Sequence, residues 1–361
     1  MNWACRMSDS VIQRHPTLGI KWAYEWGVIL KGIQAVWENT HDQRYLDYIQ
    51  ACINDYVLPD GTIRMYRPDE YNIDNINTGK LLFFLHDQTH DPRYLKAITA
   101  LRGQLAHHPR TQSGGFWHKQ IYPHQMWLDG IYMGAPFYAQ FAHYFDEPAI
   151  FDDIAHQVKL ITQHTRDEKT GLLYHGWDES CAQAWANPQT GQSSHFWGRA
   201  MGWFVMALVD ILDYFPASHP DIPTLRHILA NCADALVRVQ HDGLWYQILD
   251  TPQRAGNYPE ASASCMMVYA LAKGARCGYL PASYLDNAKY AYSRIIQQFI
   301  TVDADNLVNL NGICGVAGLG GAPYRDGSYE YYLSEPIVSN DDKGVGAFIM
   351  ASAEMERLHA V

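Results

Sequence analysis

Two aspartates, Asp74 and Asp129, are candidates for chemistry, and Asp129 stands among residues that are mostly apolar or aromatic. Asp129 follows Trp127 and Leu128, and Asp74 follows Ile73. A carboxyl group is costly to bury in such surroundings unless it has partners or a role. A carboxyl group that holds a proton can act as a general acid. The other side chains of the kinds that catalytic and sugar-binding sites use are His118, His175, Trp197, Arg199 and Trp203.

Each of these residues also has a structural interpretation when it is considered alone. Acids are common in the first turn of a helix, where the helix dipole favours negative charge. Single tryptophans more often fill a core than line a site. Single buried histidines are more often hydrogen-bonded structural residues than catalytic ones. The functional interpretation gains weight because all of these residues fall at the same position of a repeat.

The repeat is marked by one phrase that opens amphipathic stretches. Asp-Gln-Arg-Tyr-Leu begins at Asp42 and Asp-Pro-Arg-Tyr-Leu begins at Asp91, with looser relatives at Asp146, His219 and Pro281. Asp followed by Pro or a polar residue is a helix-start signal. Each of these charged, outer helices is followed by a glycine-centred turn and then by a stretch with little charge. The stretches with little charge, predicted to be inner helices, are residues 74–87, 125–145, 197–215, 260–278 and 342–358.

Residues 2–14, as an outer helix, and 18–38, as an inner one, complete six helix pairs. Repeats of about 50–60 residues, each a helical hairpin, predict an open solenoid or a closed toroid. The ends carry no polar capping repeat, which favours closure. We therefore expect an all-α fold, an (α/α)₆ barrel formed by residues 1–361 as a single catalytic domain. In such a ring the inner helices are parallel, so the residues at their starts meet at one mouth.

Composition and charge narrow the class of function. The formal net charge is −11 and no block of Lys or Arg is present, so nucleic acid and anionic membranes are poor partners. The seven cysteines are scattered without a C-x-x-C pair, which predicts neither a zinc site nor a disulfide framework. The first ten residues do not have the pattern of a signal peptide. We expect a cytoplasmic protein.

Three blocks of the sequence resemble glycoside hydrolase family 105, the unsaturated rhamnogalacturonyl hydrolases. The blocks are His118-x₆-Gln125-Met126-Trp127-Leu128-Asp129-Gly130, then Trp197-x-Arg199-x₂-Gly202-Trp203, and the run from Ala317 to Tyr332. The likeness extends from about Gly27 to Glu356, and the family has an (α/α)₆ barrel. It implies that Asp129 is the catalytic acid and that Asp74 is the second aspartate of the pocket. The substrate contacts that it implies are Tyr24, His118, His175, Trp197, Arg199 and Trp203.

The resemblance also implies a mechanism and a substrate. Such enzymes act on the C4=C5 enol ether that polysaccharide lyases leave in a non-reducing uronate. Proton delivery to C4 and water addition at C5 give a hemiketal, which opens and releases the rest of a small pectin-derived oligosaccharide. Asp129 must start protonated, a state that an apolar wall and the neighbouring Asp74 carboxylate favour. Arg199, with His118 or His175, is the candidate for holding the uronate carboxylate. No metal or other cofactor is expected.

Other functions are compatible with parts of this pattern. An unsaturated glucuronyl hydrolase that acts on glycosaminoglycan fragments would share the fold and the chemistry, but sulfated substrates would require more Lys or Arg near the mouth. A sugar epimerase on the same barrel would require a pair of acid–base histidines on facing inner helices. A carbohydrate-binding scaffold without activity would leave Asp129 without a role.

The C-terminal segment 309–340 is rich in glycine and then in tyrosine. It precedes the last inner helix, so the toroid geometry places it at the same mouth as Asp129. Long segments without secondary structure of their own are usually functional or disordered. We expect this segment to form one wall of the pocket and to restrict it to short substrates that are attacked from one end.

Overall fold

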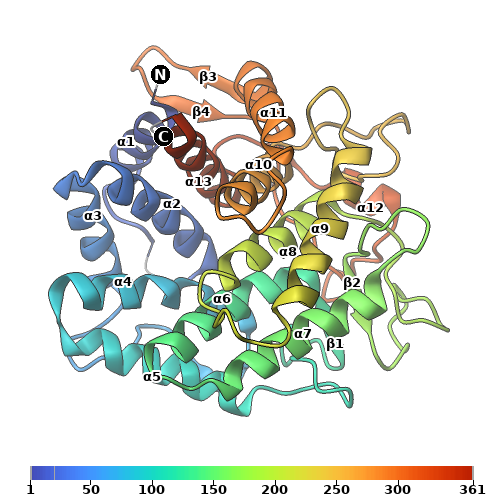
Figure 1. Cartoon of the computed structure of the whole chain (residues 1–361), viewed down its shortest axis with the longest axis horizontal. Helices are drawn as coiled ribbons and strands as arrows, with labels where there is room; N and C mark the ends of the chain where they lie inside the picture. Colours follow the sequence, from blue (N-terminus) through green and yellow to red (C-terminus); the bar gives the residue numbers. More distant parts are fainter. Residues whose placement is uncertain (1, 20, 360–361) are drawn as a thin grey trace.

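The helices alternate along the chain between an outer and an inner layer of a ring (Figure 1). The computed structural model describes residues 2–19 and 21–359. Within them the outer helices are α1 (Trp3–Arg14), α3 (Gln43–Asn54), α5 (Pro92–His107), α7 (Ala149–Thr165), α9 (Ile222–Val239) and α11 (Tyr284–Phe299). The inner helices are α2 (Tyr24–Thr40), α4 (Lys80–Thr89), α6 (Leu128–Tyr144), α8 (Gly198–Ile211), α10 (Ala261–Arg276) and α13 (Asp342–His359). The predicted (α/α)₆ barrel is confirmed.

The recurring aspartates begin outer helices as predicted. The side chain of Asp42 accepts the backbone N–H of Arg44 at 3.0 Å, and Asp91 accepts the backbone N–H of Arg93 at 2.9 Å. Each carboxylate thereby satisfies a backbone donor that the first turn leaves unpaired, and its charge suits the positive end of the helix dipole. The phrase in the sequence is therefore a repeated N-terminal cap.

Two inner elements begin differently from the prediction. The stretch that was expected to be helical from residue 74 starts as a 3₁₀ segment, η2 (Ile73–Gly79). Asn77 donates to the carbonyl of Tyr24 at 3.1 Å and Thr78 donates to the carbonyl of Ala23 at 2.9 Å. These side-chain bonds to a neighbouring segment compete with regular α-helical geometry. The inner helix expected over 18–38 begins only at Tyr24, and residue 20 lies outside the described residues.

The third inner segment also begins with a different structure, because its first residues form a strand. Strand β1 (Gln125–Trp127) pairs antiparallel with β2 (Gly176–Asp178), with Trp127 opposite Gly176. Helix α6 starts only after this strand. The partner strand lies about 50 residues further along the chain, so local periodicity could not predict the pairing.

The ring closes where the last inner helix packs against the first. Gly32 on α2 and Gly346 on α13 allow the two backbones to approach closely, because a Cβ on Gly346 would lie 2.6 Å from the backbone of Val28. A Cβ on Gly32 would lie 2.9 Å from the Cβ of Ile349. The other inner elements contact their neighbours in order around the ring. Its inner helices are therefore parallel, as a closed toroid requires.

The segment 309–340 has secondary structure of its own, so the expectation of an irregular loop was wrong. The hairpin of β3 (Ile300–Val302) and β4 (Val308–Leu310) leads into it, and β5 (Ile313–Cys314) pairs with β6 (Ile337–Val338). Between the last two strands lies the short helix α12 (Tyr329–Ser334). The strand partners are too short to give a periodic signal, since β5 and β6 have two residues each. None of the helices in the described residues has the length and apolar character needed to cross a membrane.

A side chain at the closing seam should destabilise the ring. We predict that Gly346→Ala lowers the free energy of unfolding by about 1–3 kcal/mol, because the added methyl group would overlap the backbone of α2. Urea denaturation measures this difference. The matched control is Gly103→Ala, at an exposed helical position with no heavy atom within 4 Å of the added Cβ. The control should be neutral or stabilise the protein by up to about 1 kcal/mol. Equal stability of the two variants would show that the seam tolerates a separation of the helices.

Candidate active site

Asp129 lies in the first turn of α6, where the pairing of β1 with β2 brings a histidine to it. The backbone N–H of Leu128 donates to the carbonyl of His175 at 3.0 Å. The Nε2 atom of His175 then lies 3.3 Å from Oδ2 of Asp129. The Nδ1 atom of the same ring lies 2.7 Å from the hydroxyl of Tyr332 on α12. His175 is completely buried, whereas the Asp129 side chain keeps 13% of its surface exposed. The imidazole therefore has one orientation, and the carboxyl group remains accessible.

A second cluster surrounds Asp74 at the start of η2. The Nζ atom of Lys119 lies 2.7 Å from one carboxylate oxygen of Asp74, and Nε2 of His118 lies 3.6 Å from the other. Burial would raise the pKa of Asp74, but the ammonium of Lys119 and the imidazole of His118 hold this pKa below its usual value. Burial also lowers the pKa of His118 to about 4, against the attraction of Asp74. Near neutral pH, Asp74 is therefore an anion and His118 is uncharged.

The two clusters lie close enough to interact electrostatically. The carboxylates of both Asp74 and Asp129 act on the titration of His118, which is buried. The phenol of Tyr24 is half-buried, and burial is the largest cause of the rise in its pKa. The charges of Asp74, Asp129 and Arg199 also act on this pKa. The predicted residues Asp74, Asp129, His118, His175 and Tyr24 thus gather at one mouth.

Aromatic rings form a stack beside these groups. The indole of Trp127 is nearly parallel to the rings of His118 and Tyr122, at centroid distances of 4.3 and 5.0 Å, and those two rings lie 6.5 Å from each other. Arg325, from the C-terminal segment, donates to the hydroxyl of Tyr122 at 2.8 Å and lies 5.8 Å from the centre of the Trp127 ring. Tyr332 and Arg325 together confirm that the C-terminal segment lies at the mouth of Asp129.

The structure commits Arg199 to partners inside the protein. Its side chain is 1% exposed, and its Nε donates to the hydroxyl of Ser262 at 2.8 Å. Its terminal nitrogens donate to the backbone carbonyls of Cys314 and Gly315, and the carboxylate of Glu260 lies 3.6 Å away. Burial opposes the charge, but Glu260 raises the pKa of Arg199 above its usual value. The guanidinium thus holds strand β5 against α10, and a contact of Arg199 with the substrate stays a prediction.

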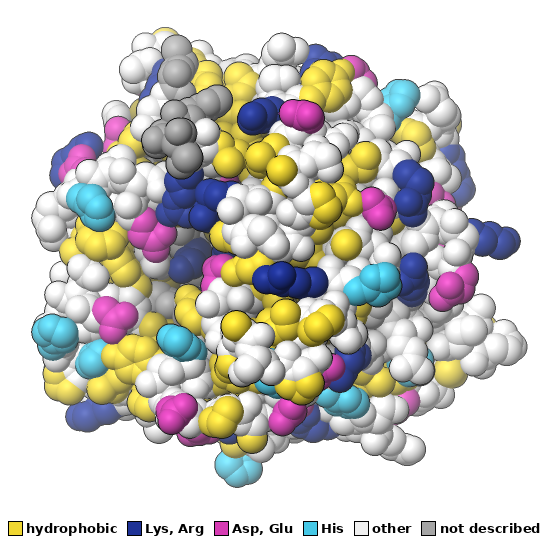
Figure 2. Space-filling model, in the orientation of Figure 1, with side chains coloured by type: hydrophobic (Ala, Val, Ile, Leu, Met, Phe, Trp, Pro, Cys, Tyr) yellow, Lys and Arg dark blue, Asp and Glu magenta, His cyan; other side chains and the backbone are white. Residues whose placement is uncertain are grey.

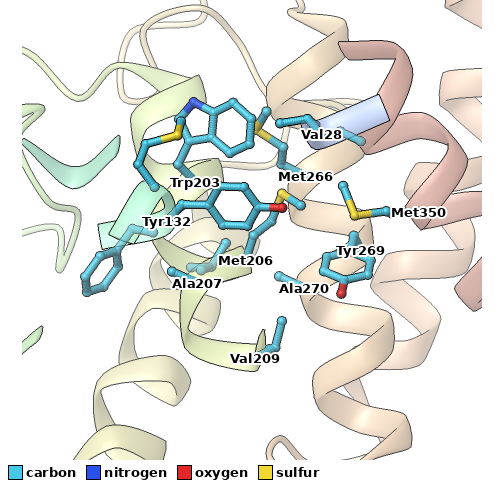
Figure 3. Close-up of a cluster of buried hydrophobic side chains, with 14 of the residues drawn as sticks. Val28, Tyr132, Trp203, Met206, Ala207, Val209, Met266, Tyr269, Ala270 and Met350 are labelled. Atoms are coloured by element: carbon cyan, nitrogen blue, oxygen red, sulfur yellow. The ribbon is translucent and has the colours of Figure 1, made fainter. Parts of the chain in front are cut away.

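The two predicted tryptophans of the second block are also buried. Trp197 is 1% exposed, donates to Gln247 at 3.1 Å and packs against the His175 ring at 4.7 Å. Trp203 is equally buried and stacks on Tyr132 at 4.7 Å within the core between α6 and α8 (Figure 3). Trp197 therefore packs against a residue of the site, His175, whereas Trp203 contacts Tyr132 in the core between α6 and α8. Substrate contacts at both positions stay predictions.

Some residues of this site were not singled out from the sequence. Lys119 adjoins His118 in the chain. Its positive charge, opposite to the charge of Asp74, could have indicated that the two side chains pair. Tyr332 and Arg325 fall in the third resembling block, but only the fold brings them to His175 and Trp127. Tyr122 precedes β1 by three residues and had no signal of its own.

The arrangement has the elements of proton-transfer chemistry. An accessible carboxyl group, Asp129, adjoins a buried and oriented imidazole, and the carboxylate of Asp74, with a lowered pKa, lies in the neighbouring cluster. Such a pair of carboxyl groups in different environments can divide the roles of acid and charge stabiliser. Among the described residues, no group of three His, Cys, Asp or Glu side chains is placed to hold a metal ion.

Comparisons with known proteins agree with this architecture. The sequence profile of Glycosyl Hydrolase Family 88 matches residues 3–359. The structure of a family 105 glycoside hydrolase from C. acetobutylicum is 51% identical, with a TM-score of 0.97 over 99% of this chain and 100% of that one. The unsaturated rhamnogalacturonyl hydrolase YesR of Bacillus subtilis is 28% identical over 270 residues, which cover 73% of this chain and 74% of that protein.

A more distant likeness concerns the fold alone. The unsaturated glucuronyl hydrolase of Bacillus sp. GL1, described as responsible for the degradation of glycosaminoglycan, is 15% identical. Its TM-score is 0.69 over 98% of this chain and 95% of that one. With the match of the family profile to nearly the whole chain, these findings place the protein among the unsaturated uronyl hydrolases. The chain belongs to Glycosyl Hydrolase Family 88, and its sequence resemblance to family 105 is confirmed.

Proposed function

We propose that this glycoside hydrolase removes the unsaturated galacturonyl residue from the non-reducing end of rhamnogalacturonan-derived oligosaccharides, with Asp129 as its proton donor. The observation that carries the proposal is the contact of Asp129 with His175, which Tyr332 orients from the other side. This places one accessible acid at the mouth of the barrel in a fixed position. The relative named as an unsaturated rhamnogalacturonyl hydrolase supports the choice of substrate.

The proposed reaction begins with proton transfer from the Asp129 carboxyl group to C4 of the unsaturated uronate. The C4=C5 π electrons form the new C–H bond, and the positive charge that develops at C5 is shared with the ring oxygen. Water adds to C5 and returns a proton to the Asp129 carboxylate. The resulting hemiketal opens, and its breakdown releases the remaining saccharide as an alcohol. One water is consumed, and the acid is restored.

His175 and Asp74 have supporting roles in this proposal. The Tyr332 hydroxyl lies 2.7 Å from Nδ1 of His175, and Nε2 of the same ring lies 3.3 Å from Oδ2 of Asp129 without a formed hydrogen bond. A small adjustment on substrate binding would let a hydrogen on Nε2 stabilise the carboxylate left by proton transfer. The anionic Asp74, 3.6 Å from His118, adds negative potential at the mouth. Negative potential stabilises the cationic sugar that follows the proton transfer.

Lys119 is the candidate in this structure for binding the carboxylate of the uronate. Its ammonium makes one contact with Asp74 and has further N–H donors, and its side chain remains 25% exposed. Arg199, by contrast, is 1% exposed with donors already bound inside the protein. A charge-assisted hydrogen bond from Lys119 to the uronate carboxylate would also offset the repulsion between that carboxylate and Asp74. The partly exposed ring of Tyr122, which stacks on the buried Trp127, offers a surface for the neighbouring sugar.

The C-terminal segment completes the proposed pocket. Arg325 and Tyr332 both contact residues of the site. A wall at this position would restrict the pocket to a terminal sugar and its neighbour. We therefore propose short oligosaccharides, attacked from the non-reducing end, as substrates.

The first prediction concerns the acid itself. Asp129→Asn should reduce kcat by at least about 10³-fold, because the amide keeps the shape of the side chain but delivers no proton to C4. The loss of near-ultraviolet absorbance of an unsaturated disaccharide measures turnover, and isothermal titration measures binding. Binding of the substrate should persist within a few-fold. Asp286→Asn, at an exposed position on the outer helix α11, is the control and should retain turnover. Wild-type turnover by the Asp129 variant would exclude Asp129 as the donor.

A second prediction concerns Lys119 and the pH dependence. Lys119→Met should raise KM about tenfold or more, because a charged hydrogen bond to the substrate is lost. It should also change the acid limb of the profile. In the wild type the pKa of Asp74 is depressed, so Asp74 stays ionised as pH falls from about 7 to about 5. Without the ammonium, burial becomes dominant and raises this pKa, so activity should fall over that interval.

The control for this experiment is Lys169→Met, at an exposed position. Its KM and its pH profile should match those of the wild type. If Lys119→Met changed neither quantity, Lys119 would be only a surface partner of Asp74, and another cation would have to bind the uronate.

Substrate preference separates the proposed activity from its nearest alternative. The purified protein should bleach the absorbance of an unsaturated galacturonyl-rhamnose disaccharide with a kcat/KM at least about tenfold above that for an unsaturated glucuronyl disaccharide from a glycosaminoglycan. Parallel assays under one set of conditions measure the ratio. A reversed ratio would assign the protein to glucuronyl substrates while leaving the role of Asp129 intact. Unchanged absorbance with both substrates, but altered sugar configuration, would favour an epimerase.

A further inference from the structure

A polar cavity lies at the mouth opposite Asp129. A space of about 160 Å³ is lined by the C-terminal halves of the inner elements, from Lys31 on α2 to Arg357 on α13. It joins a wider space of about 410 Å³ near Phe83 and His143, and the two share Lys80 and Gln140. Figure 2, drawn from this side, shows a hollow with basic and acidic side chains around it. The smaller space alone could hold about five waters or a small solute.

Most charges around this cavity are paired within the protein. Lys273 lies 2.6 Å from Asp210 and 2.7 Å from Asp213. Glu354 binds Arg276 at 2.6 Å and Arg357 at 2.7 Å. A further contact of 2.8 Å joins Arg357 to Glu38. The lining has five basic and four acidic side chains, and these pairs use all four acids.

Two lysines have no ion pair within 4 Å among the described residues. Lys31 donates to the amide oxygen of Gln34 at 3.1 Å, and, against the effect of burial, its charge lowers the pKa of Glu38. Lys80 is 2% exposed, and its Nζ finds no hydrogen-bonding partner in the part of the chain that the structure describes. The ammonium lies 3.8 Å from the centre of the Tyr132 ring, which satisfies it on one side only. Burial lowers the pKa of Lys80 to about 7, against the attraction of Asp210.

An acceptor without a partner lies in the same cavity. Gln140 donates through Nε2 to the hydroxyl of Tyr214 at 2.6 Å, but its Oε1 has no partner among the described residues. Buried polar groups in proteins are nearly always satisfied by protein, water or a ligand. A cation and an acceptor that both lack partners in one cavity therefore indicate an occupant that accepts from the lysine and donates to the amide.

We propose that this opposite mouth binds a small oxyanion that carries a hydroxyl group, with Lys80 and Lys31 on the anionic oxygens and Gln140 Oε1 on the hydroxyl. A hydroxy-carboxylate and hydrogen phosphate share this chemistry. The local excess of basic side chains contrasts with the net charge of −11 for the whole chain. The negative charge of the rest of the protein repels anions. A small anion is therefore expected to bind at this mouth, where basic side chains outnumber acidic ones.

Titration calorimetry on the intact protein tests the proposal with two probes, inorganic phosphate and glycolate, at about pH 6, where Lys80 is charged. At least one probe should bind, and Lys80→Met should weaken that binding about tenfold or more. Lys289→Met, on the outer helix α11, is the matched control and should bind as the wild type does. Turnover of the unsaturated disaccharide, which uses the other mouth, verifies that each variant is folded.

The two probes distinguish a phosphate site from a carboxylate site. Absence of binding of both probes to the wild type at millimolar concentration would overturn the proposal, as would unchanged binding by Lys80→Met. If Lys80→Met failed to fold, Lys31→Met would decide the question. A loss of binding in that variant supports the site, and retained binding overturns it.

Discussion

Closure of the helical ring is the constraint on which the rest of this structure depends. The last inner helix, α13, packs against the first, α2, at a seam where Gly32 and Gly346 let the backbones approach. Closure makes the inner helices parallel, so their N-terminal ends and the segments before them share one mouth. Residues as distant in sequence as Asp74, His175 and Tyr332 meet there. An open array of the same hairpins would spread them along a surface.

The same constraint forces polar groups into the two ends of the barrel, and the two ends handle charge differently. At the mouth of Asp129, the carboxylate of Asp74 is kept ionised by Lys119 despite its burial. At the opposite mouth, a network of ion pairs surrounds Lys80, whose pKa falls to about 7. A buried charge with a partner remains charged, whereas one without a partner tends toward neutrality. The two mouths therefore differ in charge: one holds an ionised carboxylate, and the other holds a lysine that loses its proton near neutral pH.

Much of the architecture could be predicted from the sequence, because it depends on local signals. Capping aspartates such as Asp42 and Asp91 mark the outer helices, and the absence of charge marks the inner ones. The positions of Asp74 and Asp129 near helix starts then predict a shared mouth, and the structure brings both to it. The starts of the inner elements were predicted less well. Asn77 and Thr78 bond to a neighbouring segment, and β1 pairs with a strand about 50 residues away, so neither structure has a local cause.

By itself the sequence determined the ring, its alternation of outer and inner helices and the set of polar residues at one mouth, since periodicity and caps are properties of short segments. Only the tertiary structure decided which of those residues face the pocket. Arg199, predicted to contact the substrate, has its donors bound to Ser262 and strand β5 and lies beside Glu260, and the substrate contact stays a prediction. Lys119, adjacent to a predicted histidine, is the cation that reaches Asp74. The physical reason is that a sequence shows only that Arg and Lys are both cations. Which partners their charged groups bind depends on contacts between segments that are distant in the chain.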